Sequence, residues 1–146
     1  MLRGNHPATI DSKGRLKIPA AFKSFLEETY GLEFYVTSLK GQSALIYPFS
    51  VWKVKEEKLL ATPSMNVQKR RFLDRTNYWG QLERMDAQGR ILIPALLRES
   101  AEMKGEVNVM GMLEYLEVWN RQRFLEHLEK NPLTDEDEAK LSDLGI

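Results

Sequence analysis

The stretch D-S-K-G-R-L-K-I-P-A-A-F-K at residues 11–23 returns as D-A-Q-G-R-I-L-I-P-A-L-L-R at residues 86–98. Six of the 13 aligned pairs are identical at this offset of 75 residues. A weaker match follows at an offset of 72, where I-Y-P-F-S-V-W (46–52) aligns with V-W-N-R-Q-R-F (118–124). The chain therefore contains an internal repeat, and we place its two copies at residues 5–60 and 79–130.

The repeated D-x-x-G-R segment has the composition of a tight turn between two strands. The carboxylates of Asp11 and Asp86 are expected to accept backbone N–H bonds two residues on, which makes them turn formers. Gly14 supplies the positive φ that ends the turn. After the turn, Leu16 and Ile18 alternate with polar Lys17, and this period of two predicts a strand.

The segments after each turn predict the same elements in both copies. Pro19 and Pro94 suit the start of a helix. In the first copy a hairpin follows at 33–39 and 44–47, and Ser50 is expected to cap a last helix. In the second copy strands are expected at 106–110 and 115–119, with Asn120 as the helix cap. The unit is thus ββαββα, present twice.

One such unit is too small to bury a secure core alone, since the chain has no cysteine for a disulfide or a thiolate metal site. We therefore expect the two copies to pack as a pseudo-two-fold pair around one barrel-like core. Residues 61–78 form a helical linker, with a short helix expected over 66–75 behind an Asn cap. Residues 131–146 form an acidic C-terminal tail, which is either a solvated helix starting at Thr134 or frayed.

A strand, a D-x-x-G-R turn and an apolar strand ending in Pro resemble the AbrB-type swapped-hairpin barrel of bacterial transcription factors. Two such units in one chain, beginning M-L-R-G and carrying S-M-N and R-R-F at the joint, resemble the MraZ family. The resemblance implies an α+β, mainly β fold. It would be a pseudo-two-fold double-ψ, swapped-hairpin AbrB-like β-barrel of two ββαββα repeats with peripheral helices.

The same resemblance implies a function. The protein would be a DNA-binding transcriptional regulator, expected to act as a repressor of the division and cell-wall gene cluster. The partners implied are double-stranded DNA carrying short direct repeats in the promoter of its own gene, and further copies of the chain in a ring-shaped homo-oligomer. The implied location is the cytoplasm, in association with the nucleoid.

Carried over by position, the family motif places its DNA-contacting arginines at Arg15 and Arg90 and its aspartates at Asp11 and Asp86. The remaining residues of the expected DNA surface are Arg3, Lys13, Gly14, Lys17 and Gly89. In the second copy Gln88 and Leu92 stand where the first has Lys13 and Lys17. We therefore expect the second copy to contribute less to DNA binding.

The net charge of the whole chain does not reveal this difference between the two copies. Lys and Arg number 21, as do Asp and Glu, so the net charge is zero. Residues 1–90 nevertheless carry +6 and residues 91–146 carry −6. A rigid turn that presents Lys13, Arg15 and Lys17 together is suited to DNA binding. The planar guanidinium group of arginine can hydrogen-bond to a phosphate or to the acceptor edge of guanine. The alternative is a well-formed turn whose surface Arg pairs with its neighbouring Asp.

Other function classes have less support in the sequence. The two histidines, His6 and His127, lie in no metal-ligand spacing and have no recognisable nucleophile partner, so no enzyme activity, metal or cofactor is expected. Membrane spans and secretion signals are also not expected, since no apolar stretch approaches the roughly 18 residues that a span needs. A non-enzymatic oligomeric scaffold without sequence-specific DNA binding remains the alternative.

Two features are open to more than one interpretation. The basic run at 69–71 with Arg75 is a second DNA-facing patch, a solvated helix face or a contact between subunits. Trp52, Trp79 and Trp119 are expected to serve packing rather than base stacking.

Overall fold

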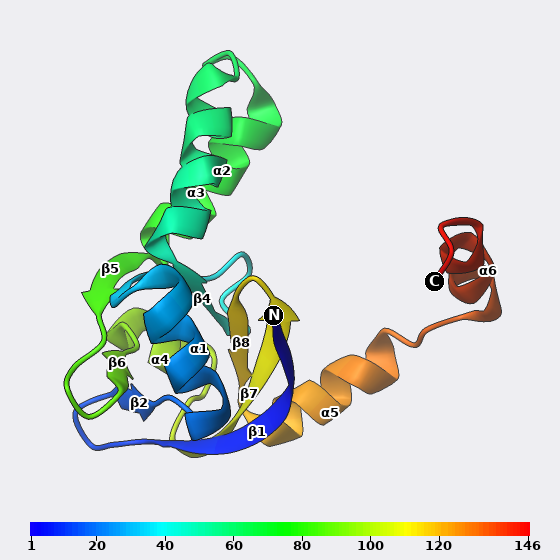
Figure 1. The fold of residues 1–146 in the computed structure, drawn as a ribbon. Helices are drawn as coiled ribbons and strands as arrows, with labels where there is room; N and C mark the ends of the chain where they lie inside the picture. The colour runs from blue at the N-terminus through cyan, green and yellow to red at the C-terminus, as the bar shows by residue number, and fades with distance from the viewer.

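A computed structural model describes all 146 residues as an antiparallel β-structure with peripheral helices (Figure 1). In chain order the elements are β1 (Leu2–Ile10), β2 (Arg15–Lys17), α1 (Ala20–Tyr30), β3 (Glu33–Thr37), β4 (Ala44–Pro48), α2 (Phe49–Ala61), α3 (Val67–Tyr78), β5 (Gln81–Arg84), β6 (Arg90–Leu92), α4 (Ala95–Ser100), β7 (Gly105–Leu113), β8 (Leu116–Trp119), α5 (Arg121–Lys130) and α6 (Asp135–Asp143). The expected α+β, mainly β fold with two ββαββα units is confirmed. None of the helices has both the length and the apolar character that crossing a bilayer requires.

The eight strands form one sheet in the order β5-β3-β4-β8-β7-β1-β2-β6, which curls into a nearly closed barrel. The first strand of each repeat pairs with the third strand of the other, since β1 pairs with β7 and β5 pairs with β3. The repeats are therefore swapped into one another. Neither could complete its sheet without its partner, so they share one core.

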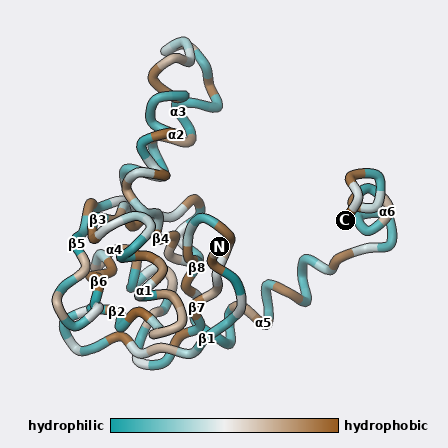
Figure 2. The backbone as a smooth tube through the Cα atoms, in the orientation of Figure 1, coloured by the Kyte–Doolittle hydropathy of each residue, from teal (hydrophilic) through white to brown (hydrophobic).

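A pseudo-two-fold axis relates the two repeats. Residues that the sequence offsets make equivalent lie opposite each other at this axis, Leu16 facing Ile91 between β2 and β6 and Leu45 facing Glu117 between β4 and β8. Leu16 and Ile91 are fully buried and belong to a cluster of 20 buried apolar residues inside the barrel. In Figure 2 brown segments recur among teal and pale ones along the barrel, as expected of strands with one buried face.

The helix ends mostly follow the expected capping chemistry. Asn66 and Asn120 accept bonds from the third backbone N–H of α3 and α5, and Thr134 with Asp137 forms a capping box on α6. The tail is therefore helical in this structure. The prediction that Ser50 caps this helix was wrong, because α2 already begins at Phe49, directly after Pro48. The linker helix is also longer than expected and ends at Tyr78.

Helices α2 and α3 form a hairpin that projects from one end of the barrel (Figure 1). Its base is held by an aromatic stack in which Trp52 lies between Tyr35 and Phe72, with ring centroids 4.8 and 6.1 Å away. The Thr37 hydroxyl also donates to the carbonyl of Thr76 at 2.7 Å. Trp52 and Trp119 are buried and Trp79 packs against the barrel core, so the three tryptophans serve packing as predicted.

Glu83 on β5 is an acidic side chain on the inner face of the barrel, opposite buried Phe34. Its Oε1 is buried without a hydrogen-bond partner, and this burial raises the pKa of Glu83. The equivalent residue in the first repeat, 75 positions earlier, is Ala8. Glu83 therefore places a carboxyl group where the first repeat has a methyl group.

Because the folded-state pKa of Glu83 is raised, ionising this carboxyl costs more in the folded than in the unfolded chain. The free energy of unfolding should therefore fall as pH rises from the unfolded pKa of Glu83 through its folded pKa. Glu83→Gln, which stays neutral, should remove this fall, as measured by urea unfolding between pH 4 and 8. Glu57→Gln on the exposed face of α2 should retain the parental pH dependence, and identical profiles for Glu83→Gln and the parent would contradict the assignment.

Candidate nucleic-acid interface

The two D-x-x-G-R turns have the same hydrogen bonds. In the first, Asp11 Oδ1 accepts from the backbone N–H groups of Lys13 at 3.0 Å and Arg15 at 2.9 Å, while Oδ2 accepts from Arg15 Nε at 2.8 Å. In the second, Asp86 accepts equivalent bonds from Gln88 and Arg90, at 2.9 Å from each backbone N–H and 2.8 Å from Arg90 Nε. Each aspartate therefore shapes its turn and also orients the arginine beside it.

These bonds keep both aspartates ionised. The backbone N–H of Arg15 lowers the pKa of the Asp11 carboxyl, and the backbone N–H of Arg90 lowers that of Asp86. The Arg–Asp pair that was the alternative to DNA contact is thus present in both turns. It occupies Nε of each guanidinium, and the side chains of Arg15 and Arg90 remain 30% and 25% exposed.

The short strands after the turns bring the two motifs side by side. β2 and β6 pair antiparallel, with Lys17 opposite Arg90 and Arg15 opposite Leu92. Directly opposed residues lie on the same face of a sheet, and the residues between them, Leu16 and Ile91, point into the core. Arg15, Lys17 and Arg90 therefore share the outer face of the β2–β6 pair at the end of the sheet, which we call the β2–β6 face.

Further bonds across the axis hold this arrangement together. The backbone N–H of Ile18 donates to the carbonyl of Gly89 at 2.9 Å, and that of Ile93 donates to Gly14 at 3.0 Å. The Lys17 ammonium also donates to the carbonyl of Gln88. Each turn is thus anchored by the strand of the other repeat, so the relative position of the two motifs is set by the barrel.

Lys23 and Arg98 are two cations beside the turns that were not predicted as site residues. A Cβ on Gly14 would lie 2.3 Å from Arg98 Cζ, and one on Gly89 would lie 2.6 Å from Lys23 Cε. Gly14 and Gly89 have positive φ angles of 86° and 75°. Each is also covered by a basic side chain from a helix of the other repeat. The signal was available in the sequence, because Lys23 and Arg98 occupy equivalent repeat positions.

Two predicted site residues remain, Lys13 and Arg3. Lys13 is exposed at the tip of the first turn. Arg3 lies at the opposite end of β1 from Asp11, about 20 Å along the strand from Ile10. It is therefore not brought together with the cations of the β2–β6 face.

The basic run at the joint lies on α3, in the hairpin at the other end of the molecule from β2 (Figure 1). Three of its cations have partners within the hairpin. Arg70 pairs with Asp74 at 2.9 Å, Lys69 donates to the carbonyl of Thr62 at 2.8 Å, and Arg75 donates to the carbonyl of Arg71 at 3.4 Å. The run is not continuous with the β2–β6 face.

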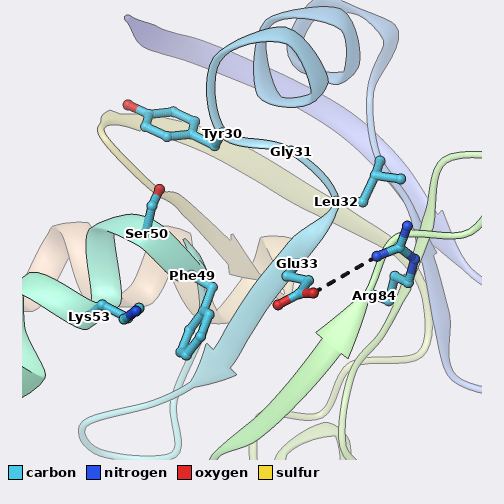
Figure 3. Close-up of a pocket in the computed structure, with 8 residues that line it drawn as sticks. All are labelled: Tyr30, Gly31, Leu32, Glu33, Phe49, Ser50, Lys53 and Arg84. Carbon is cyan, nitrogen blue, oxygen red and sulfur yellow. Dashed lines mark ion pairs between the residues drawn. The ribbon is translucent and has the colours of Figure 1, made fainter.

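The surface also has an open depression of about 480 Å³ between the end of α1, the start of α2 and β5. In Figure 3, Glu33 and Arg84 reach toward each other across it, with a closest N–O distance of 3.9 Å. None of the predicted DNA-contacting residues lines this depression. No group of three or more His, Cys, Asp or Glu side chains lies close enough together to hold a metal ion.

Comparison with known proteins identifies relatives over the full chain. The family model described as "MraZ protein, putative antitoxin-like" matches residues 1–75 and 81–144. A protein of Acidobacterium capsulatum named "Transcriptional regulator MraZ" is 52% identical over 146 residues, which is all of both chains. Proteins of the same name from Koribacter versatilis and Moorella thermoacetica are 52% identical over all of both chains and 38% identical over 87% of this chain and 86% of the relative.

Proposed function

The chain belongs to the MraZ family of transcriptional regulators, and on that premise we propose that it binds DNA sequence-specifically through the β2–β6 face. The observation that carries this proposal is the antiparallel pairing that gathers Arg15, Lys17 and Arg90 on one outer face. A two-stranded β-ribbon fits the major groove, and the short β2–β6 pair at the end of the sheet presents a comparably narrow surface. Arginines held at Nε by aspartate keep their terminal N–H groups for phosphates or guanine.

The charge distribution supports a leading role for the first repeat. Arg15 has one carboxylate partner, Asp11, whereas Arg90 has Asp86 at 2.8 Å and Asp11 at 3.9 Å. Arg90 is therefore more neutralised by its own protein. In addition, Lys13 and Lys17 have uncharged counterparts in Gln88 and Leu92.

One subunit offers few phosphate contacts, so we propose that several act together as a ring-shaped homo-oligomer. The subunit is asymmetric, since the hairpin projects from one end only, and contacts between unlike surfaces of neighbouring subunits form rings when the rotation closes. Neighbouring subunits on short direct repeats would gain affinity through effective concentration. Bound upstream of its own gene in the division and cell-wall cluster, the ring would repress transcription by blocking RNA polymerase. It would therefore act in the cytoplasm, in association with the nucleoid.

The test is a gel shift of the full-length protein on the DNA directly upstream of its gene, across a salt series, with shuffled DNA as control. We expect selective binding with a slope of log K against log salt of about −2.7 per engaged subunit for three phosphate contacts. Equal binding to both DNAs, or no dependence on salt, would contradict the proposal and favour an oligomeric scaffold.

A further inference from the structure

The α2–α3 hairpin (residues 49–78) has little core of its own. Beyond its base at Trp52, residues 53–58 are all exposed, and only a few side chains such as Leu59 and Leu73 are half-buried between the two helices. Four apolar residues of its outer part are 49–90% exposed: Val54, Leu60, Met65 and Val67. Helical stability in proteins comes mainly from packing of an apolar face, so this end of the hairpin lacks a packing partner.

The hairpin is also strongly basic. Its seven Lys and Arg residues against three acidic ones give a net charge of +4. Only one ion pair forms within it, between Arg70 and Asp74. Lys58 on α2 and Arg71 on α3 form no ion pair in the structure and are exposed.

The C-terminal arm (residues 131–146) has the opposite character. It extends away from the barrel and from the hairpin, and α6 lies clear of both (Figure 1). Its net charge is −4, with Asp135, Glu138 and Asp143 in no ion pair. Leu133, Leu144 and Ile146 are 67–80% exposed. Figure 2 shows brown segments among teal ones at this end of the chain.

We propose that the C-terminal arm of one copy docks on the α2–α3 hairpin of a neighbouring copy. The two surfaces match in three respects: each is helical, each exposes apolar side chains without a partner, and their charges of +4 and −4 are complementary. Docking buries the apolar residues of both and pairs Lys58 and Arg71 with carboxylates of α6. This interaction gives the proposed oligomer its contact between subunits, and it does not depend on DNA binding.

The hairpin of a second copy is a better docking partner for the arm than the hairpin of the same chain. The hairpin and the arm leave the barrel in different directions, so each copy presents a free arm and a free hairpin at separate places (Figure 1). Such an interface is heterologous, because the arm of one copy meets the hairpin of the next. It therefore propagates from copy to copy until the assembly closes.

The test measures the mass of the full-length protein and two variants by light scattering during size-exclusion chromatography. Deleting residues 131–146, or combining Lys58→Glu with Arg71→Glu, should each shift the protein to the monomer. The charge reversal should raise the dissociation constant at least about tenfold, since it replaces attraction by repulsion. The matched control Lys104→Glu, an exposed reversal on the barrel, should retain the parental mass.

Mixing the two variants distinguishes docking from loss of folding. The arm-deleted chain keeps an intact hairpin and the hairpin variant keeps an intact arm, so an equimolar mixture should form a dimer that neither forms alone. Circular dichroism should show parental helix and strand content in the hairpin variant, and in the arm-deleted chain the parental content less the helix α6 that the deletion removes. Parental mass for the arm-deleted chain, or no dimer in the mixture, would overturn the proposal.

The outcomes for docking and for DNA binding are separable. If the arm-deleted chain remains assembled and still binds the upstream DNA selectively, docking is wrong and the proposed function stands. If the variants dissociate as expected but the parent shows no selective DNA binding, docking stands and the proposed function is wrong. A hairpin variant of parental mass that has lost DNA binding would instead assign the hairpin cations to DNA.

Discussion

Replacing Arg15 with alanine should raise the dissociation constant for the upstream DNA at least about a hundredfold while leaving the assembly unchanged. Arg15 lies on the β2–β6 face, where its guanidinium is oriented by Asp11. Removing it takes away the bidentate donor and leaves the Asp11 carboxylate with only the more distant Arg90 guanidinium, 3.9 Å away, so that this carboxylate repels phosphate more strongly. Several subunits bind one DNA in the proposed complex, so the loss is repeated at each of them.

The variant should fold normally, because a partly exposed ion pair contributes less than about 1 kcal/mol. The measurement is fluorescence anisotropy with labelled upstream DNA, with mass and melting temperature measured on the same preparation. Arg84→Ala is the matched control, since Arg84 is an exposed arginine outside the β2–β6 face. Parental affinity for Arg15→Ala would remove this residue from the proposed interface.

Arg90→Ala is expected to weaken binding less than Arg15→Ala. Arg90 stands near two carboxylates and its repeat lacks cations at two equivalent positions, whereas Arg15 is flanked by Lys13 and Lys17. Equal losses for the two variants would show that the repeats contribute equally and that the charge difference between them is unimportant for DNA.

The second large effect is expected in the barrel itself, at Gly111 on β7. Gly111 lies opposite Gly4 where β1 and β7 pair, and a Cβ on it would lie 2.2 Å from Arg3 N and 2.5 Å from Leu2 C. Both are backbone atoms, so no side chain can move aside. Gly111→Ala must therefore separate β1 from β7, at a cost of about 3 kcal/mol in the free energy of unfolding.

This cost corresponds to a melting temperature lower by roughly 10 °C in a chain of this size. The check is thermal unfolding followed by circular dichroism, with Gly145→Ala as the control. Gly145 has a positive φ of 81°, but a Cβ on it would meet nothing within 4 Å, so its replacement should leave the barrel transition unchanged. A parental melting temperature for Gly111→Ala would mean that the strands can separate locally at little cost.

Local elements were predictable because their causes are local. The offset of 75 residues identified the turns, and Asn66 and Asn120 marked helix starts through capping chemistry that depends on neighbours in the chain. Ser50 was misassigned as a cap because Pro48 starts the helix first. Gly111 carried no sequence signal, since its close neighbours come from the other end of the chain.

For the candidate site, the residue pattern was enough to identify which residues form the two turns, their chemistry and the unequal charge of the two repeats. The pairing of Lys17 with Arg90 across two strands, the position of Arg98 over Gly14 and the separation of Arg3 from the site are visible only in the folded protein. These relations come from strands swapped between repeats. Pairing partners some 75 residues apart are selected by burial of a shared core, and no local preference of the chain specifies them.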